Sequence, residues 1–240
     1  MSGFFGSDNQ SNQGPLGALR VEVRPLMRMV YMWMTLGLLI SAFVAVAIAS
    51  TPSLAKTVYN PAVLFPAVIA ELALVLGLSF GLRRLSPNVA AIMFVLYALL
   101  NGVTLSIIFA VYAKSTISLA FFSAAGTFAA MTVLGYTTEL DLSQYRTYFM
   151  MALIGLIVAS VVNIFLHSSG LDLIISLAGV LIFTVLTAYD TQKIKRWAAD
   201  PTFTEDGSLL MKVSIMGALT LYLDFVNLFL YLLRLFARRR

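Results

Sequence analysis

The sequence predicts an all-α integral membrane protein with seven transmembrane helices in one membrane domain. Of its 240 residues, 60% are hydrophobic and 11% are charged, whereas a soluble domain carries roughly 25% charged residues. The apolar residues gather into long runs, and a helix needs about 20 of them to cross about 30 Å of hydrocarbon. The short alternating segments of a transmembrane β-barrel are absent, and lipid admits only helices or closed barrels.

The apolar runs define the expected helices in order. The first run is longer than the ~7–15-residue core of a signal peptide, although Ala45-Val46-Ala47 imitates a cleavage site. Because further runs follow, we interpret it as a retained helix. We expect residues 1–26 to form a disordered tail rich in Ser, Gly, Asn and Gln, residues 27–236 to form the membrane domain, and residues 237–240 to form a basic tail. The seven runs are 29–49, 62–82, 89–112, 117–137, 148–167, 171–190 and 210–233.

The basic residues predict the orientation in the membrane. One set of connections holds nearly all of them, whereas the opposite set holds only Lys56 and Lys114. The positive-inside rule then places the N-terminus in the cytosol. The final basic residues conflict with this, because seven complete spans put the C-terminus outside; either the tail is external or the last helix is re-entrant. The residues of the inner set are Arg20, Arg24, Arg28, Arg83, Arg84, Arg146, Lys193, Lys195, Arg196 and Lys212.

Three acidic residues stand in apolar runs. Asp190 closes the run 171–190, and Asp224 interrupts the run 210–233. A carboxylate at bilayer depth costs at least ~2.5–3.5 kcal/mol, so it normally faces protein or a water-filled cavity and marks an ion or proton path. Asp190 lies near Lys193 at the cytosolic end of its run, where an ordinary solvated acid is the plainer interpretation. Glu71, in the second run, suits an ion path or a hydrogen bond to the third helix at Asn101 or Thr104.

Asp224 belongs to a polar stripe along the last helix. The members follow one another at steps of three and four residues, which keeps them on one helix face. Because the other positions are mostly apolar, the stripe is expected to face a pore inside the bundle, with the last helix central and wrapped by other helices. Gly217 and Thr220 also suit ordinary helix packing, whereas Asp224 suits it poorly. The stripe consists of Gly217, Thr220, Asp224, Asn227, Tyr231 and Arg234.

The two aspartates predict a pH-sensitive gate for divalent cations. If their helices are neighbours, the helix rise places the carboxyl groups within ~5–10 Å of each other. Such a pair shares a proton and titrates as a unit. The protonated pair would tie two helices together, and the ionised pair would repel or recruit a cation such as calcium, which prefers hard oxygen ligands. We therefore expect a weak, transient calcium site at Asp190 and Asp224, with Glu71 and Asn227 along the ion path.

Several classes of function are excluded or disfavoured. The chain has no cysteine, which excludes disulfides and thiolate chemistry. It has no P-loop, H-E-x-x-H or G-x-S-x-G motif, so we expect neither an enzyme nor a bound cofactor, with calcium only as a permeant ion. The net charge of +5 arises largely in loops that meet anionic lipid and does not indicate nucleic-acid binding. His167, the one histidine, is expected to be solvated.

Two acid-containing motifs carry a family resemblance. They read Ala-Tyr-Asp-Thr-Gln-Lys-Ile-Lys at 188–195 and Leu-Tyr-Leu-Asp-Phe-Val-Asn-Leu-Phe at 221–229, and Asn-Gly-Val-Thr-Leu at 101–105 adds to them. Together they resemble the Bax inhibitor-1 family, the transmembrane Bax inhibitor motif proteins and their bacterial relatives. The resemblance covers all seven spans. It implies a seven-helix fold with the last helix surrounded by six, and a pH-dependent calcium leak.

The same resemblance assigns roles to individual residues. It implies that Asp190 and Asp224 are the paired acids and that Glu71 is the second-helix acid. It also implies an arginine latch near the inner end of the second helix. Arg83 is the nearest match but lies one residue late, a shift of about 100° around a helix, so Arg83 and the adjacent Arg84 are the possible latch residues.

Two alternatives to a channel remain open. Bacterial members of the family are linked to modulation of a membrane-bound quality-control protease. The chain could therefore be a regulatory protein that binds a membrane partner through helix faces or the expected inner loop 193–209, without transport. A proton-coupled transporter would show inverted repeats, and we find none. The short tail and free-standing bundle indicate a bacterial inner (plasma) membrane.

Overall fold

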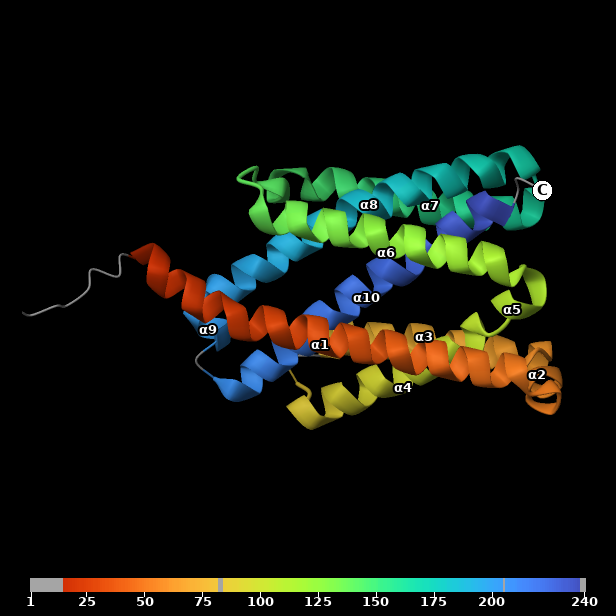
Figure 1. The fold of residues 1–240 in the computed structure, drawn as a ribbon, viewed down its shortest axis with the longest axis horizontal. Helices are drawn as coiled ribbons and strands as arrows, with labels where there is room; N and C mark the ends of the chain where they lie inside the picture. Colours follow the sequence, from red (N-terminus) through yellow and green to blue (C-terminus); the bar gives the residue numbers. More distant parts are fainter. Residues whose placement is uncertain (1–14, 82–83, 205, 238–240) are drawn as a thin grey trace, which may run out of the picture.

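The computed structural model describes residues 15–81, 84–204 and 206–237 as a bundle of helices (Figure 1). No strand occurs in these ranges, and seven helical spans are long and apolar enough to cross a membrane. The all-α, seven-span prediction is therefore confirmed. The long helices are α1 (Pro15–Ser50), α3 (Pro61–Gly81), α4 (Pro87–Leu105), α6 (Lys114–Thr137), α7 (Arg146–Leu166), α8 (Ser169–Ala199) and α10 (Gly207–Ala237).

Short helical turns connect the spans. Proline opens several helices, because its missing N–H would be unpaired in the first turn anyway. Serine caps two helices, α4 and α8: Ser86 Oγ accepts a hydrogen bond from Val89 N at 3.4 Å, and Ser168 Oγ accepts one from Leu171 N at 3.3 Å. The connecting elements are α2 (Pro52–Val58), α5 (Ile108–Val111), the 3₁₀ turn η1 (Leu142–Tyr145) and α9 (Pro201–Thr204).

Two segments expected to be irregular are helical instead. Helix α1 begins at Pro15, inside the expected tail 1–26, while residues 1–14 and 238–240 lie outside the described residues. Helix α8 continues to Ala199, so the expected loop 193–209 reduces to a connection at 200–206. The reason is that an apolar run marks only the part of a helix that lies in lipid. A polar continuation keeps its backbone hydrogen bonds in water as well.

Helix α10 is the most buried of the seven spans. It packs against α1, α4, α6 and α8, and Figure 1 shows it crossing between the group of α6, α7 and α8 and the group of α1, α3 and α4. Helix α3 packs mainly on α4, and α7 packs mainly on α8. Four of the other spans therefore provide most of the covering of α10, fewer than the six expected.

Two glycines allow backbones to approach closely. A Cβ added at Gly135 in α6 would come within 2.3 Å of the Ala188 carbonyl oxygen in α8. A Cβ added at Gly102 in α4 would come within 2.7 Å of the Ser41 carbonyl oxygen in α1. Small residues at helix contacts are typical of membrane proteins, where dispersion between closely packed backbones replaces the hydrophobic effect.

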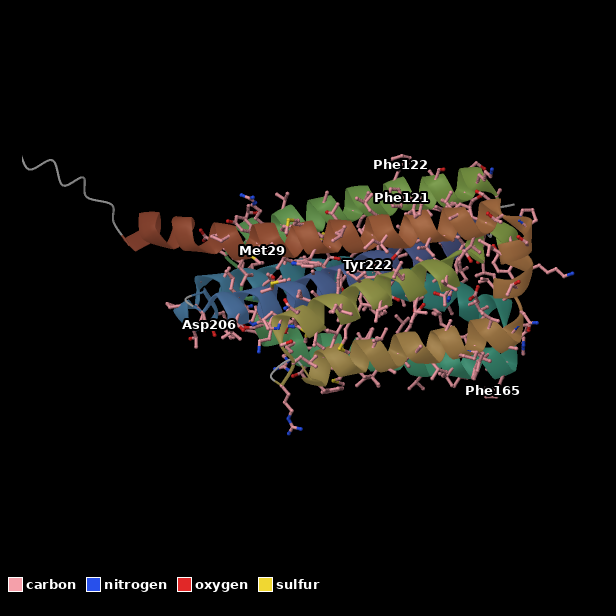
Figure 2. All side chains as sticks on the ribbon, turned by 90° about the horizontal axis from the view of Figure 1, so that it is seen from below. Met29, Phe121, Phe122, Phe165, Asp206 and Tyr222 are labelled. Carbon is pink, nitrogen blue, oxygen red and sulfur yellow. The ribbon has the colours of Figure 1, made fainter. Side chains whose placement is uncertain are left out.

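The outer surface of the bundle carries large apolar side chains. Phe80 is 84% exposed and Phe165 is 79% exposed. Figure 2 shows Phe122 and Phe165 at the outside of the bundle and Tyr222 in its interior. Such a surface would be unfavourable in water but suits contact with lipid tails, as expected for a multi-pass integral membrane protein.

Candidate functional site

Asp190 and Asp224 line the same cavity. The cavity has a volume of about 340 Å³ and lies between α7, α8 and α10. Both residues are buried, at 7% and 4% exposed. Their helices are in contact, as the expected pairing of the two acids requires. The other polar residues of the lining are Arg146, Lys193, Thr220 and Asn227.

The two carboxyl groups have different partners. Asp190 Oδ1 accepts a hydrogen bond from Lys193 Nζ at 3.2 Å, one turn along α8. Asp224 Oδ2 is buried and has no hydrogen-bond partner within the described ranges. No hydrogen bond joins the two carboxyl groups in that part of the chain, although both line the same cavity. Asp190 is therefore hydrogen-bonded within its own helix, whereas Asp224 Oδ2 lacks a hydrogen bond among the described residues.

Lys193 marks the mouth of the cavity. Its side chain is 38% exposed, whereas that of Asp190 is 10% exposed. The ammonium group also lies 5.0 Å from the ring centroid of Trp197, in cation–π geometry. Arg146, an exposed residue at the start of α7, adds a second positive charge to the lining. The charged side chains of the cavity are therefore two cations that are at least partly exposed and two buried acids.

The missing partner of Asp224 Oδ2 restricts the protonation states that this acid can adopt. An ionised carboxylate in that position would bear the full cost of lost hydration. It can remain protonated, or it can ionise while a cation occupies the cavity. Proton and cation would then compete for the same place. This competition is the chemistry that the arrangement supports.

The polar stripe of α10 divides between two environments. Thr220 and Asn227 line the cavity with Asp224, and both donate to their own helix, at Met216 O (3.0 Å) and Leu223 O (2.8 Å). Gly217 instead packs against Val30 and Ile194. Tyr231 stacks on Phe183 with ring centroids 5.8 Å apart. Only the middle of the predicted stripe therefore reaches the cavity.

Glu71 lies outside this cavity and hydrogen-bonds to the third span. Thr104 Oγ1 donates to Glu71 Oε1 at 2.7 Å, and Asn101 Nδ2 approaches Oε2 at 3.4 Å. The bonds continue to α10, because Tyr222 OH donates to Asn101 Oδ1 at 2.7 Å. Tyr222 OH also lies 2.6 Å from Ser41 Oγ in α1. Of the two sequence-based alternatives for Glu71, the hydrogen bond is the one seen here.

Tyr222 and Asp224 place these two polar sites on different sides of α10. They are two residues apart, which is about 200° around a helix. Tyr222 is not part of the polar stripe of α10 and was therefore not predicted as a site residue. Lys193 and Arg146 were predicted only as charges that set the orientation in the membrane, although both line the cavity. The spacing of Lys193, three residues after Asp190, was the signal for the ion pair.

Of the two possible latch residues, Arg84 is not part of the cavity lining. Arg83 lies outside the described residues. Arg84 is exposed in the turn after α3 and makes no salt bridge with any residue that the structure describes. The arginine in the cavity lining is Arg146, at the start of α7.

The pair offers a cation two carboxyl groups. Within the described ranges there is no cluster of three or more His, Cys, Asp or Glu side chains that could hold a metal ion. Any calcium at the pair would keep much of its water, because calcium takes six to eight oxygen ligands. Such a site suits passage of the ion better than storage.

Seven spans with acids buried between them define a multi-pass integral membrane protein with an ionisable interior. The family profile described as "Inhibitor of apoptosis-promoting Bax1" matches residues 23–240. The inner membrane protein YbhL of Escherichia coli K12 is 47% identical over 222 residues, covering 92% of this chain and 94% of that protein. An uncharacterized protein of Deinococcus radiodurans is 42% identical, covering 89% of this chain and 90% of its own length. The protein RP147 of Rickettsia prowazekii, also uncharacterized, is 39% identical, with 91% of each chain covered.

The chain therefore belongs to the Bax inhibitor-1 family, as its two aspartyl motifs indicated.

Proposed function

We propose that this protein is a pH-sensitive calcium leak channel, gated by protonation of the Asp190–Asp224 pair. The observation that carries the proposal is Asp224, a buried carboxyl group whose Oδ2 lacks a partner within the described residues and which shares a cavity with Asp190. A neutral pair offers a cation little attraction, whereas an ionised pair attracts one into the bundle. The protonation state thus decides between a sealed and a conducting protein.

Lys193 acts in this proposal as a competitor of the permeant ion. Its ammonium group neutralises Asp190 at the mouth of the cavity, at 3.2 Å. A divalent cation that enters must displace this ammonium group or pass beside it. Lys193 therefore hinders the entry of the cation, and protonation of Asp224 removes the negative charge that would attract it.

The test is calcium flux into liposomes that contain the purified protein, measured with an enclosed dye across a pH series. The wild-type protein should show pH-dependent flux, and Asp224→Asn should remove the pH dependence because the amide cannot titrate. Asp206→Asn is a matched control, since this exposed residue lies just before α10, at one end of the bundle (Figure 2), and is not part of the cavity lining. Unchanged pH-dependent flux in Asp224→Asn would reject the gate, and no flux from the wild type would reject the channel.

The proposal also includes the orientation of the protein in the membrane. Loop charges favour a cytosolic N-terminus, which puts the Lys193 mouth on the cytosolic side of a bacterial inner membrane. Because the chain has no cysteine, a single cysteine placed at Asp206 reports its side by reaction with an impermeant maleimide. Labelling only after the cells are opened is the expected result. Labelling of intact spheroplasts would reverse the orientation.

A further inference from the structure

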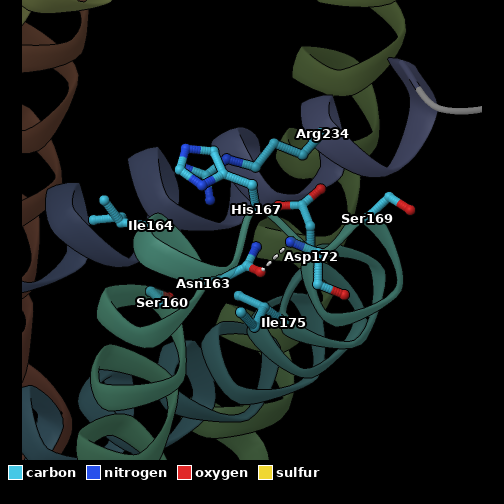
Figure 3. A pocket seen from close by; sticks show the side chains of 9 residues that line it. Ser160, Asn163, Ile164, His167, Ser169, Asp172, Ile175 and Arg234 are labelled. Carbon is cyan, nitrogen blue, oxygen red and sulfur yellow. Dashed lines mark hydrogen bonds between the residues drawn. The ribbon is translucent and has the colours of Figure 1, made fainter.

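A second cavity lies at the other end of α10. It has a volume of about 390 Å³ and forms where α7 ends, α8 begins and α10 makes its last turn (Figure 3). Its lining includes Arg234, which lies ten residues, or about 15 Å, beyond Asp224 along the helix. The two cavities share no lining residue. It is therefore separate from the aspartate cavity.

Arg234 brings a positive charge to this cavity. Its guanidinium carbon lies 5.4 Å from the ring centroid of Tyr231, so the side chain packs on the aromatic face. Arg234 makes no salt bridge within the described part of the chain. The planar fork of a guanidinium group matches the oxygens of a phosphate. An exposed guanidinium group that packs on an aromatic ring at the edge of a cavity is a suitable ligand for such an anion.

Asn163 adds a hydrogen-bond donor beside Arg234, and His167 adds one in its imidazolium form. Asn163 Oδ1 accepts from Ser168 N at 3.1 Å, which fixes the amide so that its Nδ2 points to the His167 side in Figure 3. His167, in the left-handed conformation at φ 50°, ends α7. Its Nδ1 lies 3.2 Å from Phe165 O and must donate, because a carbonyl only accepts. In the imidazolium form, Nε2 offers one more donor.

Asp172 is the one acidic side chain in the lining. It disfavours an anion beside α8 and leaves the region around Arg234, Asn163 and His167 as the place for a phosphate. Ile164 of the lining is 65% exposed, and its neighbour Phe165 in α7 is 79% exposed, so the outer surface of α7 next to the cavity is apolar. A cavity that is polar at the end of the spans and apolar along their flank fits an amphiphile with a phosphate head.

We propose that this cavity binds the phosphate group of a phospholipid headgroup, with Arg234 as its principal ligand and the acyl chains along the last turns of α7. The proposal does not depend on calcium transport.

The test is native mass spectrometry of the full chain in detergent, titrated with phosphatidylglycerol or with diacylglycerol, which lacks the phosphate. The wild type should retain phosphatidylglycerol and not diacylglycerol, and Arg234→Gln should weaken retention about tenfold. Lys212→Gln is the matched control, because it removes a positive charge from the other end of α10 and should bind as the wild type does. Arg234→Lys, which keeps the charge but loses the fork, should fall between.

A second arm identifies the source of the phosphate. Glycerol 3-phosphate at millimolar concentration should raise the melting temperature of the wild type less than the lipid does. Equal protection by both would assign the cavity to a soluble phosphate compound and overturn the lipid assignment. Equal retention of phosphatidylglycerol by Arg234→Gln and the wild type, with both folded by thermal melting, would overturn the site itself.

Discussion

Helix α10 carries two buried polar sites that differ in how well their groups are satisfied. On one side, Tyr222 joins Ser41 and Asn101 through bonds of 2.6 and 2.7 Å, and Asn101 reaches Glu71. On the other side, Asp224 Oδ2 has no partner in the described residues. A satisfied network fixes helices in place, whereas an unsatisfied acid stays responsive to protons and cations. The Tyr222 side therefore holds the bundle together, and the Asp224 side is free to change state.

The largest effect should come from crowding the satisfied side. Gly102→Ala would place a Cβ 2.7 Å from the backbone oxygen of Ser41, beside the Tyr222 network, and should cost about 3 kcal/mol of stability or more, because backbone cannot move aside as a flexible side chain can. Gly126→Ala in α6 is the matched control, because nothing lies within 4 Å of its added Cβ. It should be neutral or stabilising by up to about 1 kcal/mol. Thermal unfolding in detergent measures both, and equal melting temperatures would contradict the close approach.

A smaller loss is expected when the network itself is cut. Tyr222→Phe keeps the ring but leaves Asn101 Oδ1 and Ser41 Oγ without the shared hydroxyl, at a cost of about 1–3 kcal/mol. Ser41→Ala combined with Tyr222→Phe should cost less than the sum of the two single changes, because both remove the same bond. Strict additivity in the unfolding free energies would show that the two hydroxyls are not coupled.

Asp224→Asn, unlike Tyr222→Phe, should not lower the stability of the protein. It replaces an unsatisfied acid by a neutral amide of the same size, so thermal stability at neutral pH should be unchanged or higher. Comparing the melting temperatures of Asp224→Asn and Tyr222→Phe tests directly whether the two sides of α10 differ. A loss of stability as large as that of Tyr222→Phe would mean that Asp224 has a structural partner, and the contrast between the two sides would disappear.

The smallest effect on stability is expected for Asp141, an exposed acid with both a hydrogen bond and an ion pair. Asp141 accepts from Ser143 N at 3.0 Å and lies 3.0 Å from Arg196. The hydrogen bonds from Ser143, more than the Arg196 charge, lower the pKa of Asp141 below its ordinary value of 3.8. Its stabilising contribution is therefore complete above pH 3.8 and lost as the pH falls through the lower folded-state pKa.

Asp141→Asn should thus lower the melting temperature slightly at pH 6 and less at pH 3. Glu139→Gln, an exposed acid two residues earlier, is the control for the loss of one surface charge. A larger loss for Asp141→Asn at pH 3 than at pH 6 would reverse the sign of the linkage.

The fold could be predicted from the sequence because lipid imposes a simple rule on every span. Apolar runs of about 20 residues located all seven helices to within a few residues in the membrane. The rule fails at helix ends in water, which is why the extension of α8 to Ala199 was not predicted. Composition also could not show how many helices would cover α10, since that depends on close contacts such as Gly135 with Ala188.

The site could be predicted only in part. Asp190 and Asp224 stand out because an acid is costly at bilayer depth, and they do share a cavity. Tyr222 and Ser41 do not stand out, because tyrosine and serine are common in membrane helices and their bonds form only after the helices pack. Lys193 was visible in the sequence but ambiguous, since one lysine can serve both as a topology charge and as the partner of Asp190.

The peripheral place of α7 has a consequence for motion. This helix supplies Arg146, Phe149 and Met150 to the wall of the aspartate cavity, yet it packs mainly on α8. One edge-to-face ring pair, Phe149 with Tyr189 at 5.3 Å, forms part of that contact. Swinging α7 outward would widen the cavity while the contacts of α10 with α1 and α4 stay intact. Among the three helices that line the cavity, α7 is therefore the one whose displacement would break the fewest contacts in the rest of the bundle.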